Sequence, residues 1–305
     1  MGYSFQKAKK EKIWVKALLV GSSGSGKSYS ALRLATGLYN KVGGTGIAVI
    51  DTESGRIKYY ANEFNFDVLE LDEPFMPEKY IEAIDAAVEA GYKVIIIDST
   101  SHEWNYLTQQ AQSSPNGFNA WAKLKPRHRR FTEKILNAPA HIIATGRGKD
   151  EYVVEEKNGK NVPKKVGVGV QQEKDAEYEY TITFNIIQDT HIAESTKDNT
   201  HIFDGKFEVL TEKHGEALYD WANSGDTPAP KPVKTEDTRT LKEVLEEIKS
   251  TFEDGINKGL DKEAMYKIVA DNTPDNKKNF MLISDIDVAE FVLEKIVEFV
   301  NPVNN

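Results

Sequence analysis

The sequence predicts an α/β fold in which a mainly parallel central sheet is flanked by helices, with a small helical domain at the C-terminal end. Short apolar runs, which read as buried strands, alternate with stretches whose apolar residues recur at helical spacing. A proline-rich, charged segment then separates this pattern from a purely helical one. We therefore expect a core at residues 1–225, a linker at 226–237 and a helical domain at 238–305.

The first half of the core reads as alternating strands and helices. An apolar run at residues 13–20 predicts a buried strand, and a glycine-rich loop leads from it into a helix at 29–39. The elements expected next are strands at 46–51 and 66–71, a helix at 77–90 and a strand at 93–98. Such alternation favours parallel strands with helices on both faces of the sheet.

The second half of the core changes from apolar to polar. A helix is expected at residues 119–137 with an interruption at Pro126, and a buried strand at 141–145. The polar, lysine-rich stretch 151–167 carries Asn158-Gly159, a hairpin-turn signal. Late strands are expected at 178–187 and 191–195, and capping signals at 240–243 and 284–287 predict helices in the tail.

Composition excludes several classes of protein. The 305 residues include no cysteine, which rules out disulfides, thiolate metal sites and a cysteine nucleophile. No apolar stretch approaches the roughly 20 residues of a membrane span, so we expect no membrane contact and a cytoplasmic location. The net charge of -9 argues against unspecific attraction to nucleic acid, so any such contact must come from local basic segments.

The glycine-rich loop fits the phosphate-binding template GxxxxGK[ST]. Its glycines let successive N–H groups point at phosphate oxygens, and the following helix adds its positive dipole end. This pattern predicts ATP as ligand, with Lys27 at the β- and γ-phosphates and Ser28 at Mg²⁺. A flexible Gly/Ser loop is the alternative, which the flanking strand and helix disfavour. The predicted loop consists of Gly21, Ser22, Ser23, Gly24, Ser25, Gly26, Lys27 and Ser28.

Two acidic residues at strand ends are candidates for the remaining ATPase chemistry. Asp98 ends an apolar strand, the position at which a P-loop ATPase needs a carboxylate to hold Mg²⁺ through water. The alternative is an ordinary acid at the end of a buried strand. Hydrolysis further needs a carboxylate that orients or deprotonates water. In many motor ATPases this carboxylate directly follows the magnesium aspartate, but here Ser99 occupies that position. Glu53, which follows a strand tip, is therefore the first candidate; the alternative is that it is an acid of a turn. Glu103 is the reserve candidate.

At this point the chain resembles the RecA-like recombinases, whose catalytic glutamate lies in a similar Ile-Asp-x-Glu segment. It is similar in particular to the compact phage RecA-like ATPases that act as single-strand annealing proteins, the Sak-four type. The segments that carry the resemblance are IDTESGR, IIIDSTSHEW, HIIATGRGK, NGKNVPKK, AEYEYTITF and LTEKHGEALYDWANSG, within about residues 10–225. The resemblance implies a RecA-like P-loop core, ATP hydrolysis, single-stranded DNA binding and a role in phage recombination.

Further site residues follow from this resemblance. Tyr59 or Tyr60 would stack on adenine, unless the ring packs in the core, and Arg147 would sense the γ-phosphate, unless it is a solvated arginine. Lys197 would reach a neighbouring subunit's nucleotide. Asn199 departs from the Lys-Asp-Arg pattern of the family, which puts that last role in doubt.

RecA-like proteins bind DNA through two loops, and both positions carry cations here. Cations that follow phosphates, mixed with aromatics on which bases stack, are what single-strand binding requires, although charge runs are often only solvated faces. His102, His128, His141 and His191 lack metal-ligand spacing and read as ordinary histidines. The candidate DNA-binding residues are Lys123, Lys125, Arg127, Arg129 and Arg130 near Trp121, and Lys157, Lys160, Lys164 and Lys165 near Tyr152.

Three functions remain open. The first is ATP-dependent binding and annealing of single-stranded DNA by a ring or filament with ATP at a subunit boundary, its hydrolysis stimulated by DNA. The second is a RecA-type motor such as a helicase, which shares the nucleotide site. The third is a small-molecule kinase, which the lack of a cationic lid and the lysine-rich hairpin disfavour. The acidic, tethered C-terminal domain suits a protein partner, such as a single-strand binding protein or a regulator.

Overall fold

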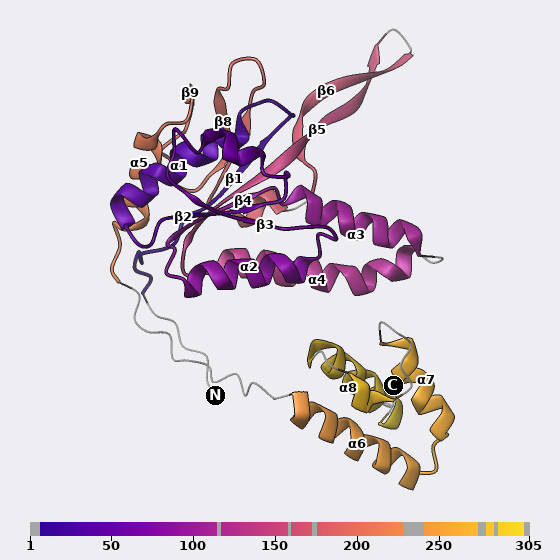
Figure 1. The fold of residues 1–305 in the computed structure, drawn as a ribbon. Coiled ribbons are helices and arrows are strands. Elements are labelled where there is room, and N and C mark those ends of the chain that lie inside the picture. The colour runs from indigo at the N-terminus through magenta and orange to yellow at the C-terminus, as the bar shows by residue number, and fades with distance from the viewer. Residues whose placement is uncertain are drawn as a thin grey trace. The chain divides into compact units, whose positions relative to one another are not determined.

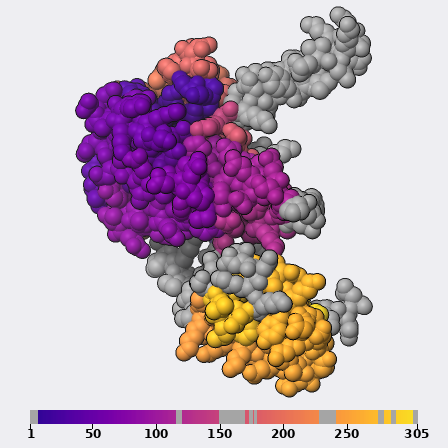
Figure 2. Space-filling model, turned by 45° about the vertical axis from the view of Figure 1, so that its right-hand side comes forward, coloured from indigo at the N-terminus to yellow at the C-terminus, as the bar shows by residue number. Residues whose placement is uncertain are grey.

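The computed structural model describes residues 7–114, 117–157, 160–172, 176–227, 241–273, 279–283 and 286–301. The chain divides into two compact units, Met1–Pro228 and Ala229–Asn305, and each has its own hydrophobic core (Figure 1). Figure 2 shows the first unit in space-filling form, with the indigo and violet segments of its first hundred residues packed into one continuous surface. Within the described ranges, no helix combines the length and apolar character needed to cross a bilayer.

The core of the first unit is a nine-stranded sheet in the order β3-β2-β4-β5-β1-β7-β8-β9, with β6 paired to β5 outside this path. Pairing is parallel from β3 to β7, and antiparallel for β7 with β8, β8 with β9 and β5 with β6. This confirms the predicted α/β class with a mainly parallel sheet. The strands are β1 Lys16–Gly21, β2 Ile47–Asp51, β3 Asp67–Glu70, β4 Val94–Asp98, β5 His141–Lys157, β6 Lys160–Val170, β7 Ile182–Ile186, β8 Ala193–Asp198 and β9 Phe207–Glu208.

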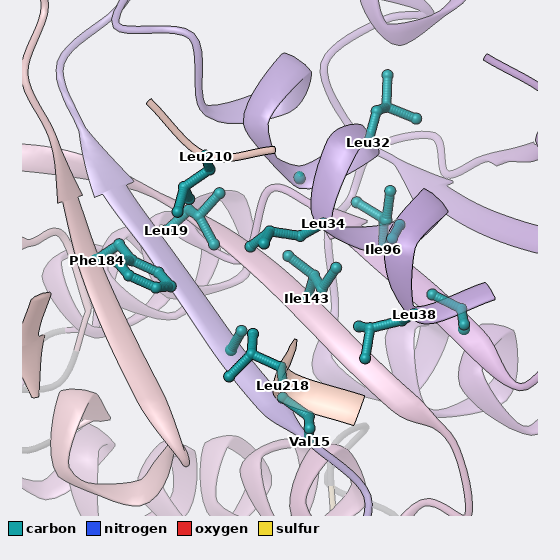
Figure 3. Packing of buried hydrophobic residues seen from close by; sticks show 14 of the residues in the cluster. Val15, Leu19, Leu32, Leu34, Leu38, Ile96, Ile143, Phe184, Leu210 and Leu218 are labelled. Carbon is teal, nitrogen blue, oxygen red and sulfur yellow. The ribbon is translucent and has the colours of Figure 1, made fainter. Parts of the chain in front are cut away.

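Helices cover both faces of the sheet. Successive strand residues point to opposite faces, so Leu19 packs with α1 and α5 while its neighbour Leu18 packs with α2 and α4 (Figure 3). The strands β1, β2 and β4 are buried at every position, which explains their continuous apolar runs. The helices of this unit are α1 Lys27–Val42, α2 Pro77–Glu89, α3 Ser101–Ser113, α4 Gly117–Asn137 and α5 Glu212–Ala222, with short 3-10 helices η1 Arg56–Tyr60 and η2 Ala176–Glu179.

Three expected elements differ in extent. The strand expected at 178–187 covers only Ile182–Ile186, and the 3-10 helix η2 extends to Glu179 before it. Helix α4 passes through Pro126 without a break, because its apolar residues Phe131 and Ile135 are buried against the sheet and its cations pair with α2. Strand β5 does not end at Thr145 but continues to Lys157, pairing with β6 along the way. The turn at residues 158–159 and the linker residues 228–240 lie outside the described residues.

The second unit is helical, as expected for the tail. It comprises α6 Leu241–Asn257, α7 Lys262–Asp271, the 3-10 helix η3 Phe280–Leu282 and α8 Ile286–Val300. Val244, Ile248 and Phe252 on one face of α6 pack with Met265 of α7 and Ile296 of α8. Asp261 caps α7 by accepting a hydrogen bond from the Glu263 amide.

The buried His141 at the start of β5 makes the stability of the first unit dependent on pH. Its Nδ1 accepts a hydrogen bond from the Val15 amide at 3.0 Å, and among the described residues nothing bonds its Nε2. Burial lowers the pKa of His141 to about 4, aided by the charge of Lys16. In the unfolded chain the ring takes up its proton near pH 6.5, so unfolding binds a proton between these values.

We therefore expect the free energy of unfolding to fall by about 3 kcal/mol as the pH drops from 6.5 to 4. Urea unfolding followed by tryptophan fluorescence measures this, because all four tryptophans, Trp14, Trp104, Trp121 and Trp221, lie in the first unit. His141→Gln should flatten the dependence, whereas His201→Gln, at an exposed site, should not. An unchanged slope in His141→Gln would contradict the assignment.

Candidate nucleotide site

The carboxyl ends of β1, β2 and β4 meet the Thr145–Arg147 part of β5 at one edge of the sheet and position the site. The register places Asp51 beside Asp98 and Gly21 beside Arg147. A cavity of about 820 Å³ opens at this edge. Its lining includes most of the predicted nucleotide residues, namely Ser23, Gly24, Gly26, Lys27, Ser28, Glu53, Tyr59, Tyr60, Asp98 and Arg147.

The phosphate-binding loop has a backbone that only glycine adopts readily. Gly24 and Gly26 have φ angles of 78° and 88°, in the left-handed region. A Cβ atom on Gly21 would come within 2.7 Å of the Ile186 carbonyl oxygen, so β7 restricts this position as well. These constraints explain why the three glycines stand at these places in the loop.

Lys27 begins α1 and reaches back across the loop. Its Nζ donates to the carbonyl oxygens of Gly21 at 2.9 Å and Ser22 at 2.8 Å. Burial lowers the pKa of Lys27, and the nearby charges of Asp98 and Glu53 oppose that shift. The ammonium group therefore lies inside the cavity, at the center of the loop, where a phosphate chain would be bound.

Ser28 and Asp98 form the oxygen pair that a P-loop site needs for Mg²⁺. Ser28 Oγ donates to Asp98 Oδ2 at 2.6 Å, and Thr145 Oγ1 of β5 donates to Oδ1. Burial raises the pKa of Asp98, while these two hydrogen bonds oppose the rise. Hydroxyl and carboxylate oxygens are hard ligands that suit Mg²⁺, so both residues fit the ion, which would neutralise phosphate charge.

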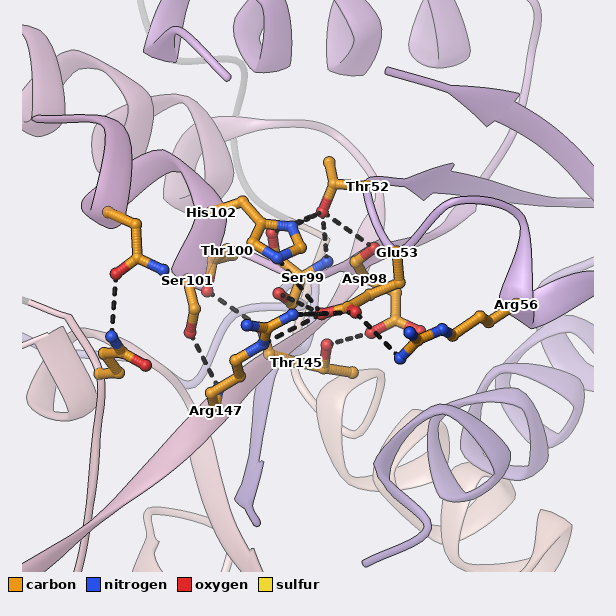
Figure 4. Close-up of polar contacts among 12 residues, drawn as sticks. Thr52, Glu53, Arg56, Asp98, Ser99, Thr100, Ser101, His102, Thr145 and Arg147 are labelled. Atoms are coloured by element: carbon orange, nitrogen blue, oxygen red, sulfur yellow. Dashed lines mark hydrogen bonds and ion pairs between the residues drawn. The ribbon is translucent and has the colours of Figure 1, made fainter. Parts of the chain in front are cut away.

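Glu53 is held by Arg147 from the neighbouring part of the sheet (Figure 4). The guanidinium group donates to Oε1 at 2.9 Å and Oε2 at 3.0 Å through Nη2, and to Oε1 at 3.2 Å through Nε. Ser99 Oγ donates to Oε1 at 3.3 Å, and Arg56 Nη1 lies 3.8 Å from Oε2. Burial raises the pKa of Glu53, but the hydrogen bonds and charge of Arg147, with smaller contributions from His102 and Ser99, outweigh it and hold the pKa below its usual value.

His102 and Thr52 support Glu53 from behind. His102 Nδ1 lies 2.8 Å from Thr52 Oγ1, and its Nε2 lies 3.6 Å from Glu53 Oε1. Thr52 Oγ1 accepts a hydrogen bond from the Ser99 amide at 2.9 Å. The sequence did not single out Thr52, and the interpretation of His102 as an ordinary histidine is corrected here, because the ring lies beside Glu53.

Three tyrosines line the open side of the cavity. Tyr59 is 79% exposed, whereas Tyr60 is half-buried and meets Tyr29 edge-on at 5.3 Å between ring centroids. Tyr60 also packs against the hydrophobic core. Both rings line the cavity, so the structure does not decide between them. Adenine stacking by one of them stays a prediction.

His191, interpreted from the sequence as an ordinary histidine at the start of a strand, is a residue of the site and precedes β8. It adopts a left-handed conformation, with φ at 57°, in the turn after β7, and its Nδ1 donates to the Ser25 carbonyl at 2.9 Å. The ring packs over Gly26 and lines the cavity. The signal available in the sequence was its place shortly after a predicted strand; the structure adds that this strand is parallel to β1, so its turn opens at the same edge of the sheet.

Two other candidates lie away from the cavity lining. Lys197 on β8 donates a hydrogen bond to the Tyr180 carbonyl and does not line the cavity. Its contact with the nucleotide of a neighbouring subunit stays a prediction. Glu103 is fully buried in the first turn of α3, where its Oε2 lies 2.9 Å from His128 Nδ1. This placement fits a structural role better than contact with the nucleotide.

The predicted DNA-binding cations divide into four groups. Arg127 bonds Glu78 of α2 at 2.6 and 2.8 Å, and Arg130 lies 3.8 Å from the same carboxylate, so both face α2. Arg129 is exposed and pairs with Glu133. Lys123 and Lys125 also lie on α4. Lys157, Lys160, Lys164 and Lys165 are on the β5–β6 hairpin, but their side chains lie outside what the structure describes.

The fold and this edge of the sheet define a P-loop ATPase with an α/β fold. The chain belongs to the AAA_24 family of AAA domains, which matches residues 14–215, about two thirds of its length. Among solved structures, it is similar to a KaiC-like protein from the hyperthermophilic archaeon Pyrococcus horikoshii OT3, with 14% identity and a TM-score of 0.35 over 61% of this chain and 79% of that one. A search of curated proteins found no relative.

Proposed function

We propose that this ATPase binds single-stranded DNA and anneals strands in recombination, as a phage-encoded protein in the cytoplasm of a bacterial host. The observation that carries the proposal is the continuity of β5. Thr145 and Arg147 on this strand contact Asp98 and Glu53 in the nucleotide site, and the same strand runs on to Lys157 in the lysine-rich hairpin. The hairpin projects beyond the sheet (Figure 1), so one continuous strand would connect the nucleotide site to the proposed strand-binding lysines.

The nucleotide site supplies each group that hydrolysis requires. Lys27 and the loop amides would bind the phosphates, and Ser28 with Asp98 would hold Mg²⁺. Glu53 would orient the attacking water and accept its proton, since its low pKa keeps it ionised at pH 7. Arg147 would contact the γ-phosphate. To do so, its guanidinium group must give up some of its hydrogen bonds to Glu53 and donate to phosphate oxygens instead.

A groove along α4 supports the DNA part of the proposal. Its volume is about 910 Å³, and its lining includes Trp121, Lys125 and the apolar Leu136. Arg129 lines it as well, with its charge balanced by Glu133, and Glu179 adds a second carboxylate. An indole ring beside cations is the combination that binds bases by stacking and phosphates by charge. Arg127 and Arg130 contribute less to this surface, because Glu78 already balances their charges.

The proposal includes two kinds of protein contact. Tyr59 at the cavity and Phe207 on β9 are 79% and 61% exposed, which suits contact with a second copy in a ring or filament. The helical unit at residues 229–305 would bind a single-strand binding protein or a regulator. A RecA-type motor would use the same nucleotide site; it is distinguished by ATP-dependent strand separation.

DNA binding through the hairpin should appear as a strong salt dependence. We expect single-stranded DNA to raise ATP turnover, and log Kd to rise steeply with log salt concentration. Replacing Lys157, Lys160, Lys164 and Lys165 together by alanine should lower this slope by about three, at roughly 0.7 per phosphate contact. Fluorescence anisotropy with a labelled strand measures it, and Lys41→Ala, on α1 away from the hairpin, is the control.

Two outcomes would contradict this proposal. One is ATP turnover that single-stranded DNA leaves unchanged, together with binding that salt does not weaken. The other is an annealing assay in which labelled complementary strands pair no faster with the protein than without it. A kinase would instead consume ATP with a small acceptor and without DNA.

A further inference from the structure

A second cavity opens beside the nucleotide cavity and shares a wall with it. Its volume is about 420 Å³, about half that of the nucleotide cavity. Glu53, Arg56 and Arg147 line both cavities, so the ion pair between Glu53 and Arg147 faces both. Lys27, Ser28 and Asp98 line the nucleotide cavity and not this second one.

The opposite wall is one face of α3. His102, Asn105, Tyr106 and Gln109 follow each other at spacings of three, one and three residues, which places them on the same side of the helix. Asn105 Oδ1 accepts a hydrogen bond from Gln171 Nε2 at 2.9 Å, which orients its amide. The amides of Asn105 and Gln109 offer both donors and acceptors to the cavity.

The remaining wall is aromatic, and the lining as a whole carries no net charge. Phe75 stacks on His102 with 5.0 Å between ring centroids and 19° between planes. The two arginines of the lining are balanced by Glu53 and Glu73, and burial lowers the pKa of His102, which leaves that ring neutral at pH 7. A neutral lining disfavours a free phosphate or another small anion. It favours a flat, uncharged group that both donates and accepts hydrogen bonds.

We propose that this cavity binds one unpaired base of a nucleic acid strand. The inference rests on the proposed single-strand binding and names a subsite for it. The nucleotide cavity has room for a base, a sugar and three phosphates, and half that volume accommodates a base with its sugar. The base edge would bond Asn105 and Gln109, and its face would pack on the aromatic wall, as in other sites that read unstacked bases.

A base in this cavity would act on the nucleotide site through its shared wall. It would contact His102, whose Nε2 is 3.6 Å from Glu53 Oε1, and the guanidinium group of Arg147. ATP turnover would then respond to the bases of a bound strand. The phosphates of that strand would contribute to its affinity but not to this response.

The experiment compares two strands of equal length on the full chain, one of thymidylate residues and one of abasic residues with the same phosphates. We expect both to bind, and only the strand with bases to raise ATP turnover. Gln109→Ala should weaken binding of the thymidylate strand about fivefold, the value of one neutral hydrogen bond, and leave abasic binding unchanged. Gln110→Ala is the matched control, since Gln110 is the next residue on α3, is also exposed and does not line the cavity.

The possible results separate this inference from the proposed function. If the abasic strand raises turnover equally, or if Gln109→Ala behaves like Gln110→Ala, the base subsite is wrong while single-strand binding stands. If neither strand binds, the proposed function fails and the subsite falls with it. Both glutamines are exposed on a helix surface, so neither variant should impair folding.

Discussion

Replacing Lys27 by alanine should reduce ATP hydrolysis by about 10²- to 10³-fold or more, because the variant loses the one ammonium group that reaches across the phosphate-binding loop. The effect is large because Lys27 lies in a partly buried cavity, where a charge interacts strongly with phosphate oxygens. Steady-state phosphate release measures it. Any change in DNA binding that depends on ATP should disappear as well.

The same substitution should leave the fold intact. Burial already lowers the pKa of Lys27, so the folded chain loses little by giving up this charge, and the Gly21 and Ser22 carbonyls lose one hydrogen bond each, at about 1 kcal/mol. Mg²⁺-ATP should raise the Tm of the native protein and not that of Lys27→Ala. Lys41→Ala is the control, being on the same helix and paired with the exposed Asp220. Turnover within a few-fold of the native value in Lys27→Ala would exclude the predicted role.

The residues at strand tips were predictable because a parallel sheet brings its carboxyl ends to one edge. Lys27, Glu53 and Asp98 each follow a buried apolar run or its glycine-rich loop, and the structure places all three in one cavity. The pairing of Arg147 with Glu53 was not predictable in this way. These residues are 94 positions apart, and they meet only because β5 lies next to β4 in the sheet, an order that the sequence does not specify.

The basic helix α4 shows a different limit. Its cations looked like a surface for phosphates, yet Arg127, Arg130 and Lys134 lie three and four residues apart and thus on one side of the helix. On α2, Glu78 and Asp85 are spaced to meet them, and the structure pairs the two sets. The spacing could be read from the sequence, but only the structure shows that these cations of α4 face the carboxylates of α2. A count of basic residues on α4 therefore overestimates how many of them could bind DNA phosphates.

Glu53→Gln should reduce ATP hydrolysis by about 10²- to 10⁴-fold while nucleotide binding is retained, which separates it from Lys27→Ala. The amide keeps the size of the carboxylate but cannot accept a proton from water. Arg147 loses its charged partner, yet its side chain is 44% exposed, so water can solvate it and the fold should persist. Glu70→Gln, at the end of the neighbouring β3, is the control. Full turnover in Glu53→Gln would mean that another group activates the water.

The pH dependence of hydrolysis gives a second measurement of the same role. Arg147 holds the pKa of Glu53 below its usual value against the opposing effect of burial. Turnover of the native protein should therefore persist to pH values below the ordinary glutamate range before it falls. Arg147→Ala removes the stabilising charge and leaves burial, so the pKa of Glu53 in the free protein should rise and the acid limb of the kcat/KM profile should move to higher pH. An acid limb that stays in place in Arg147→Ala would show that Glu53 is not the group whose ionisation limits turnover.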